Sequence, residues 1–480
     1  MFNHKTSLDE LHQPNVESYN LSFVEVRPRS VSNDKFLSSV NLQFPIQIAG
    51  GKYVDLSRSY FEFELDVGIL PQGAVGDANV VPLGRNAREF STGPVAMELS
   101  QAGAVTTPPV EGFNGSCGLD RAWWANCLSA VRHKVNGNTI CSSNDVVSST
   151  IAAMQSHTSD YNENQGSAFC YQIDDSARRN ATSQDRKFRT AMRPLQSMNC
   201  KALIPGSVSQ QIELDFKQFA LYKQAIFKIN GVPDQLLNAD NDFDSTKMEA
   251  AFGHIDSVPK TGDTPLTTDK VFFGITDIKL MVCTVADKMN RAIPPSMLLE
   301  WEDHDVHRFN AHTDQINAQI DIQHGHRASI FTRLPGEAND AAVNCVAPGR
   351  QAVVAMREAS VLIGGVQYPT PAYRLVGRTD ADALRAYLLY YDANSAFSQQ
   401  TPGGEKSFLE WSQTPLLSQK LAIASEPGKQ KLSTTLRIQY ENTEGNSNLS
   451  RDCTLASSYV KAALLSFTGG ELRSVRLSTV

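Results

Sequence analysis

The alternation of apolar and acidic residues between Phe61 and Val67 is the feature that most restricts how this chain can fold. Phe61, Phe63, Leu65 and Val67 are apolar, whereas the three residues between them are carboxylates. Successive side chains of a strand point to opposite faces of a sheet, so the apolar groups share one face and the acids share the other. The pattern predicts a strand that packs on a core with one face and meets water with the other.

The residues before this strand predict that it belongs to the opening of a sheet. A short apolar run at 44–48 is followed by Gly50 and Gly51, and a second run follows at 53–56. Glycine pairs allow the chain to turn where side chains would clash. Similar alternation recurs at 212–216 and 432–440. Together these patterns favour an all-β fold with short inserted helices.

Composition narrows the class of protein. Of 480 residues, 41% are hydrophobic and 20% are charged, which is ordinary for a chain that buries a sizeable core. The net charge is −7, and acidic and basic residues balance in residues 1–40. Because binding to nucleic acid irrespective of sequence requires a basic patch or arm, this composition disfavours that function.

The N-terminal segment and the cysteines indicate where the chain is made. No run approaches the roughly 18 apolar residues of a membrane helix. Residues 1–15 lack the apolar core of a signal peptide, so we expect synthesis without one, in a reducing compartment. The eight cysteines are scattered and form no CxxC pair, which predicts buried thiols rather than disulfides or metal ligands.

The second half of the chain repeats the order of segments found in the first half. Asn136-Gly137 and Gly364-Gly365 are hairpin signals 228 residues apart. Each precedes a predicted helix, one from position 145 and one over 380–397, and then an alternating strand. This recurrence indicates a structural duplication. A last hairpin is predicted at Gly469-Gly470.

One histidine-rich segment is a candidate metal site. Five of the ten histidines fall within 23 positions, with three acids beside them: His304, His307, His312, His324, His326, Glu302, Asp303 and Asp305. Imidazole and carboxylate groups are zinc and iron ligands. The segment is also polar and loop-like, which favours a solvated connection between strands. The prediction is therefore no metal and no cofactor, with a metal site or an interface histidine cluster as alternatives.

Other residue types that carry chemistry have structural interpretations. The serines lack a GxSxG elbow and the glycines lack GxGxxG, so the glycine pairs are turn formers. The paired acids at 62/64 and 174/175 fit a wet strand face and a loop. Trp123 and Trp124 fit a core or subunit contact better than base stacking. We predict no catalytic, cofactor-binding or metal residues and no enzymatic activity.

Four stretches together resemble the double jelly-roll major capsid proteins of icosahedral DNA viruses, in particular those of the adintovirus, polinton and virophage group. These stretches are the opening at 44–67, the hairpin and helical segment at 129–161, the hairpin and helix at 361–397, and the closing hairpin at 454–478. The resemblance implies two tandem eight-stranded antiparallel jelly rolls. It places an arm at 1–20, the first roll at 21–235, a connection at 236–270 and the second roll at 271–480.

The resemblance also implies function and partners. It implies a homotrimeric, pseudo-hexameric capsomer in a virion shell, in contact with neighbouring capsomers and with penton and minor capsid proteins. Direct sequence-specific binding of nucleic acid is not expected, whereas an internal membrane is compatible with the resemblance. Loops at 68–116 and 336–350 would form the outer tower or trimer contacts. The alternatives are a minor capsid or spike protein and a metal-dependent β-sandwich enzyme or lectin.

Overall fold

The computed structural model describes the greater part of the strands and one long helix. The described residues are 19–29, 41–48, 51–82, 117–119, 127–144, 147, 186–217, 226–228, 252–267, 270–287, 293–311, 315–323, 325–333, 356–374, 380–395, 408, 411, 416–421, 432–440 and 451–479. Residues 1–18 of the arm predicted at 1–20, residues 83–116 of the loop predicted at 68–116, and the loop at 336–350 therefore lie outside the description. The described ends of the first two predictions include strand residues, at 19–20, 68–70 and 81–82.

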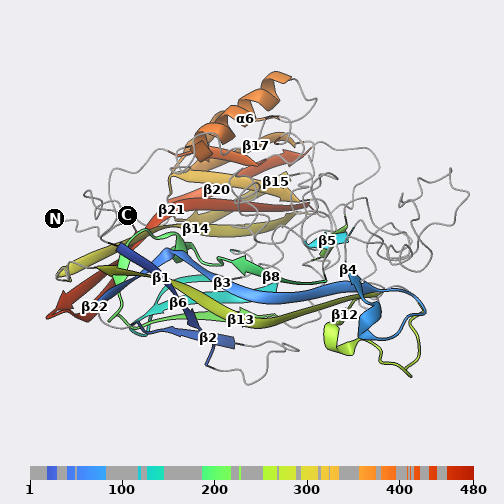
Figure 1. Cartoon of the computed structure of the whole chain (residues 1–480). Coiled ribbons are helices and arrows are strands. Elements are labelled where there is room, and N and C mark those ends of the chain that lie inside the picture. The colour runs from blue at the N-terminus through green and yellow to red at the C-terminus, as the bar shows by residue number, and fades with distance from the viewer. Residues whose placement is uncertain are drawn as a thin grey trace, which may run out of the picture.

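The first jelly roll consists of two facing sheets (Figure 1). One sheet has the order β1, β13, β3, β8: Tyr19–Val26, Lys270–Asp287, Lys52–Leu70 and Lys187–Met192. The other has the order β2, β10, β6, β7: Asn41–Ile46, Gln210–Phe216, Leu128–Val135 and Asn138–Asn144. Short strands extend the first sheet, namely β4 (Val81–Pro82), β9 (Leu203–Pro205) and β12 (Phe252–His254).

The second jelly roll has the same construction. One sheet has the order β14, β21, β16, β19: Ser296–Ala311, Arg451–Thr468, Arg327–Arg333 and Leu417–Lys420. The other has the order β15, β20, β17, β18: Gln315–Ile322, Leu432–Tyr440, Met356–Ile363 and Val366–Tyr373. A further strand, β22 (Glu471–Thr479), pairs with β21.

The two rolls are topologically equivalent. If the eight main strands of each roll are numbered along the chain, both rolls have one sheet in the order first, eighth, third, sixth. Both have a second sheet in the order second, seventh, fourth, fifth. The predicted fold class of two tandem jelly rolls is confirmed. The remaining described elements are small: the pair β5 (Cys117–Leu119) and β11 (Ile226–Lys228), and the 3-10 turns η2 (Asp77–Asn79), η5 (Gln196–Asn199) and η8 (Ile255–Ser257).

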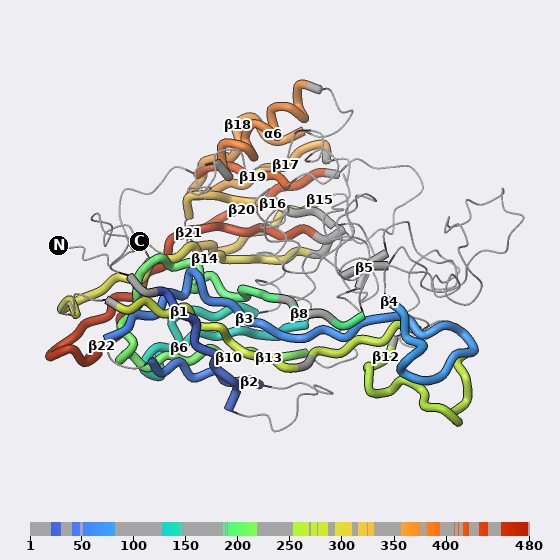
Figure 2. The backbone as a smooth tube through the Cα atoms, viewed as in Figure 1, coloured from blue at the N-terminus to red at the C-terminus, as the bar shows by residue number. Residues whose placement is uncertain are grey.

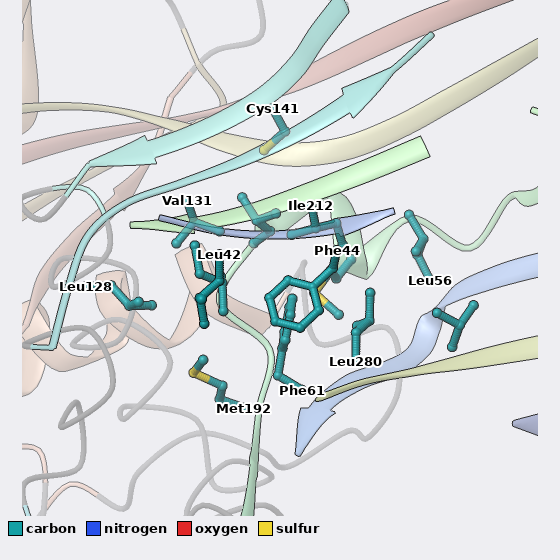
Figure 3. Close-up of a cluster of buried hydrophobic side chains, with 14 of the residues drawn as sticks. Leu42, Phe44, Leu56, Phe61, Leu128, Val131, Cys141, Met192, Ile212 and Leu280 are labelled. Carbon is teal, nitrogen blue, oxygen red and sulfur yellow. The ribbon is translucent and has the colours of Figure 1, made fainter. Parts of the chain in front are cut away.

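The core of the first roll is built by the alternation seen in the sequence. Phe61 and Phe63 are buried on the inner face of β3. Phe44 of β2 meets Phe61 across the two sheets, with ring centroids 5.0 Å apart and planes at 78° (Figure 3). Edge-to-face packing of this kind is favourable beyond the buried area alone. The inner face of the predicted opening strand therefore packs against the facing sheet.

The boundary between the rolls differs from the one predicted. The strand at 270–287 was expected to open the second roll, but β13 pairs with β3 and β1 over most of its length. It is the eighth strand of the first roll and lies between these two neighbours. Part of the predicted connection is also packed on this roll, because Val258 is buried with Leu70 and Phe272.

The predicted hairpins and the second helix are confirmed. Asn136 and Gly137 adopt φ of 48° and 80° between β6 and β7, as a tight hairpin turn requires. Helix α6 spans Asp380–Ser395. The first predicted helix lies outside the described residues except at Val147, whose N–H donates to Asn144 Oδ1 at 2.9 Å. In the described part of the chain, α6 included, no helix has the length and apolarity needed to span a membrane.

Strands β14 and β21 join the two rolls into one packed unit. Their central residues belong to the second roll, but Met297, Leu299 and Trp301 of β14 are buried in the core of the first roll. Leu465 of β21 joins them there. Figure 2 shows the two rolls side by side, with α6 on the side of the second roll remote from the first. Because buried apolar surface is the main source of stability, this shared core fixes the two rolls together.

A neutral histidine is buried in the first roll and makes its stability pH-dependent. Burial lowers the pKa of His133 from 6.5 to about 4. In the neutral ring, Nε2 donates to Gln210 Oε1 at 3.2 Å and Nδ1 accepts from the Ser197 hydroxyl at 3.1 Å. The unfolded chain therefore binds a proton at a higher pH than the folded chain does.

We expect His133 to reduce stability as the pH falls from 6.5 to about 4. Between these values the unfolded state binds more protons than the folded state does. The free energy of unfolding therefore decreases by up to about 1.4 kcal/mol for each unit by which the pH is lowered. The measurement is urea denaturation at several pH values for the wild type and for His133→Gln. The variant should show a shallower dependence in this range, and an equal slope would contradict the assignment.

Candidate functional site

The first part of the histidine-rich segment, residues 302–311, lies on strand β14, which pairs with β21. The predicted loop-like, solvated connection is wrong over 302–311, because this stretch pairs with β21 along its whole length. Polar residues are accommodated here because β21 presents Ser457 and Ser458 opposite Asp305 and His304. The polar composition therefore reflects polar neighbours on adjacent strands rather than exposure to water.

A charged cluster forms where β14, β16 and β21 meet. Arg327 of β16 is buried, and its Nη2 donates to Glu302 Oε1 at 2.6 Å. The same guanidinium donates to Ser458 Oγ from Nε at 3.3 Å and from Nη2 at 3.2 Å. His304 Nδ1 lies 2.9 Å from that hydroxyl, and His326 Nε2 lies 3.7 Å from Glu302 Oε1. The Ser458 hydroxyl thus connects Arg327 to His304.

The electrostatics of this cluster favour a fixed ion pair. Burial tends to raise the pKa of Glu302, but the charge of Arg327 outweighs it and holds this pKa well below its usual range. Burial lowers the pKa of His304, with Glu302 opposing that shift. Glu302 is therefore ionised and His304 neutral near pH 7. This combination satisfies the arginine and does not resemble an acid and base prepared for proton transfer.

A second ion pair lies on the opposite face of β14. Asp303 is buried, and Lys461 Nζ of β21 lies 3.1 Å from its Oδ2. Asp305 Oδ2 accepts from the Gln323 N–H at 2.8 Å, and His307 Nε2 lies 3.2 Å from Asp305 Oδ1. The acids of the segment are therefore occupied by cations and backbone donors of neighbouring strands.

The structure brings together only part of the predicted metal-ligand set. Across the residues that the structure describes, no three histidine, cysteine or acidic side chains are arranged to hold a metal ion. His312 and His324 lie outside the described residues. The absence of a metal site consequently stays a prediction. Trp123, Trp124, Asp174 and Asp175 also lie outside them.

Glu62, one of the paired acids of β3, is part of an ion-pair ring on the outer face of the first sheet. The ring runs from Glu25 through Arg27, Asp277, Arg189, Glu62 and Lys279 and back to Glu25. Its six nitrogen–oxygen distances lie between 2.7 and 3.4 Å. The sequence predicts a wet face for Glu62, which fits, but its direct partners Arg189 and Lys279 come from two other strands that are distant in sequence. Exposed pairs of this kind contribute little to stability individually.

Comparison with known proteins identifies the fold. The solved structure of the mavirus major capsid protein superposes with a TM-score of 0.50 at 8% identity, covering 99% of this chain and 96% of that one. The Faustovirus major capsid protein superposes with a TM-score of 0.50 at 10% identity, covering 95% of this chain and 92% of that one. No protein-family model matches the sequence, and no curated protein matches it.

These matches extend over nearly the whole of each chain, so they include both rolls and the strands that join them. The fold of this chain is that of the double jelly-roll major capsid proteins. At 8% and 10% identity the likeness is one of architecture, carried by strand order and not by shared side chains.

Proposed function

We propose that this chain is a major capsid protein, the structural subunit of the shell of an icosahedral DNA virus. The observation that carries the proposal is the pair of equivalent rolls in one chain, matched over nearly full length by two viral major capsid proteins. The work of such a protein is mechanical. It requires stable sheets and complementary outer surfaces, and it makes no use of a catalytic centre.

The joined rolls support a trimeric capsomer. Two rolls held by a shared core form one unit, and three such units present six similar rolls around a threefold axis. A block of nearly hexagonal outline can tile a flat facet of a shell. The partners of the trimer would be neighbouring capsomers, together with penton and minor capsid proteins, in the virion. The net charge of −7 agrees with a shell that does not hold the genome through a basic arm.

We place the boundary between the rolls at residues 288–295. Strand β13 ends at Asp287 inside the first sheet, and β14 begins at Ser296 with the first strand of the second roll. The first roll would then comprise about residues 19–287, and the second would extend to Thr468, with β22 as an added strand. The pairing of β13 with β1 and β3 supports this division.

The test of the capsomer is the mass of the purified chain in solution. Light scattering should give three times 52.6 kDa, about 158 kDa, and negative-stain images should show a hexagonal outline. A minor capsid or spike protein with similar rolls would lack that outline. A stable monomer or dimer that carries stoichiometric metal would contradict the proposal and favour the β-sandwich enzyme or lectin.

A further inference from the structure

The outer face of helix α6 carries an apolar stripe that the second roll does not cover. Leu384, Leu388 and Tyr391 follow one another at helical spacing and are 46%, 56% and 42% exposed. The helix packs on the roll through another face, where Tyr390 is buried against Trp411 with ring centroids 6.1 Å apart.

A second apolar patch lies on the first roll, on the outer face of β1. Alternate residues of this strand are exposed, and Leu21 and Phe23 are 45% and 51% exposed. Tyr60 of β3 extends the patch, because its ring centroid lies 5.9 Å from that of Phe23. Beyond Phe23 the same face of β1 continues into Glu25 and the ion-pair ring.

The two patches are the places where large exposed apolar side chains gather in the described part of the chain. The others exposed there are Phe408, which contacts Tyr387 beside α6, and the separate Val366 and Leu477. Each patch has charged neighbours, namely the ring beside β1 and the Lys420–Asp392 pair, 3.4 Å apart, beside α6. An apolar centre with a polar rim is typical of the surfaces through which proteins associate.

Symmetry decides which occupant fits. In a closed ring of three identical chains, each interface is heterologous, so every subunit must present two different complementary surfaces. This chain has one apolar patch on each roll, and α6 lies on the side of the second roll remote from the first (Figure 1). A symmetric dimer would instead need one patch that is complementary to itself.

We propose that the α6 stripe of one subunit docks on the β1 patch of the next subunit in the trimer. The inference rests on the closed trimer proposed above and names the surfaces that close it. Three side chains a side are too few for a stable interface of about 800 Å² per partner. They form its apolar centre, where truncation costs most binding energy.

The experiment uses complementary variants of the full chain. Leu388→Asp removes one surface and Phe23→Asp removes the other, and Val366→Asp is the matched control because Val366 is 55% exposed outside both patches. By light scattering, the wild type and the control should be trimers. Each test variant alone should be a monomer of 52.6 kDa with an unchanged circular dichroism spectrum.

Mixing the two test variants distinguishes a heterologous interface from a general loss of assembly. The Leu388→Asp subunit keeps its β1 patch and the Phe23→Asp subunit keeps its α6 stripe, so one intact interface remains. We expect a heterodimer of twice 52.6 kDa, about 105 kDa. A mixture that stays monomeric would overturn the pairing, as would test variants that remain trimeric or a control that dissociates.

Two further measurements distinguish a wrongly assigned interface from a variant that fails to fold and from a wrong capsomer proposal. If an aspartate variant fails to fold, Leu388→Ser and Phe23→Ser should each raise the dissociation constant of the trimer by about tenfold or more. An unchanged constant would overturn the interface. A monomeric wild type would overturn the capsomer proposal itself, whereas trimeric wild type and trimeric variants would overturn only the assigned surfaces.

Discussion

The Gly325→Ala substitution is expected to lower the free energy of unfolding by about 3 kcal/mol, the upper end of the usual cost of overpacking. A Cβ at this position would clash with the Ser458 carbonyl oxygen and lie 2.7 Å from Ser457 Oγ. The carbonyl belongs to β21, which is held between β14 and β16 by backbone pairing on both sides. It cannot move away without breaking those ladders.

The approach at Gly325 is fixed by bonds on either side of it. The His326 N–H donates to the Ser458 carbonyl at 2.8 Å, and Ser457 Oγ donates to the Gln323 carbonyl at 2.8 Å. Relief of the clash would lengthen both. We therefore expect the loss to appear as a lower urea midpoint, followed by circular dichroism.

The control is Gly364→Ala in the hairpin between β17 and β18. Gly364 has φ of 56°, and nothing lies within 4 Å of a Cβ built there. This change tests the backbone conformation alone, which costs about 1–2 kcal/mol. If the two variants were equally stable, close packing at Gly325 would not be the reason for the glycine.

Local pattern was sufficient for most strands and hairpins of this fold. The alternation at Phe61–Val67 predicts one buried face, and Phe61, Phe63 and Leu65 are buried in the core. Asn136-Gly137 predicts a hairpin because few residue pairs accept positive φ at both positions, and both adopt it. The buried strand face and the hairpin turn depend on residues close in sequence, so a single sequence is enough to predict them.

The sheet that a strand joins is not a local property, and here prediction failed. The residues of β13 predict a strand, but its partners on β3 and β1 lie 200 or more residues earlier in the chain. Nothing in 270–287 distinguishes the last strand of one roll from the first strand of the next.

The charged cluster where β14, β16 and β21 meet was also not predicted, because it too depends on residues that are distant in sequence. His304, Asp303 and Glu302 read as a solvated loop because their partners are distant in sequence: Ser458, Lys461 and Arg327. A strand with polar residues on both faces becomes credible only when its neighbours supply complementary groups. The glycine between His324 and His326 is explained by the close approach of β21.

The second large loss of stability is expected when the ion pair between Arg327 and Glu302 in this cluster is broken. Arg327→Met removes the cation that holds Glu302 ionised. Loss of one partner of a fully buried pair costs at least about 3 kcal/mol, and because the Glu302 side chain is 29% exposed we expect a loss of up to about that value. The double variant with Glu302→Gln should lose less, because no uncompensated charge remains. Urea denaturation of the four proteins gives the coupling between the two residues.

The matched control for this cycle is the exposed pair Lys420–Asp392, 3.4 Å apart. Lys420→Met should cost less than about 1 kcal/mol, since exposed pairs contribute little. Equal losses at positions 327 and 420 would contradict the special role of the buried arginine. So would a double variant as unstable as the sum of the two single variants.

The pH dependence of stability distinguishes the Arg327–Glu302 pair from the buried His133. Because the folded pKa of Glu302 is lowered, its contribution is complete above its ordinary value of 4.5 and is lost as the pH falls below that value. The contribution of His133 is lost earlier, from pH 6.5 downward. Glu302→Gln, which removes the titrating carboxyl, should therefore flatten the decline of stability below pH 4.5 and leave the slope between pH 6.5 and 4.5 unchanged, whereas His133→Gln should flatten the upper range. If Glu302→Gln changed only the upper range, the charge of Glu302 would not be what Arg327 stabilises.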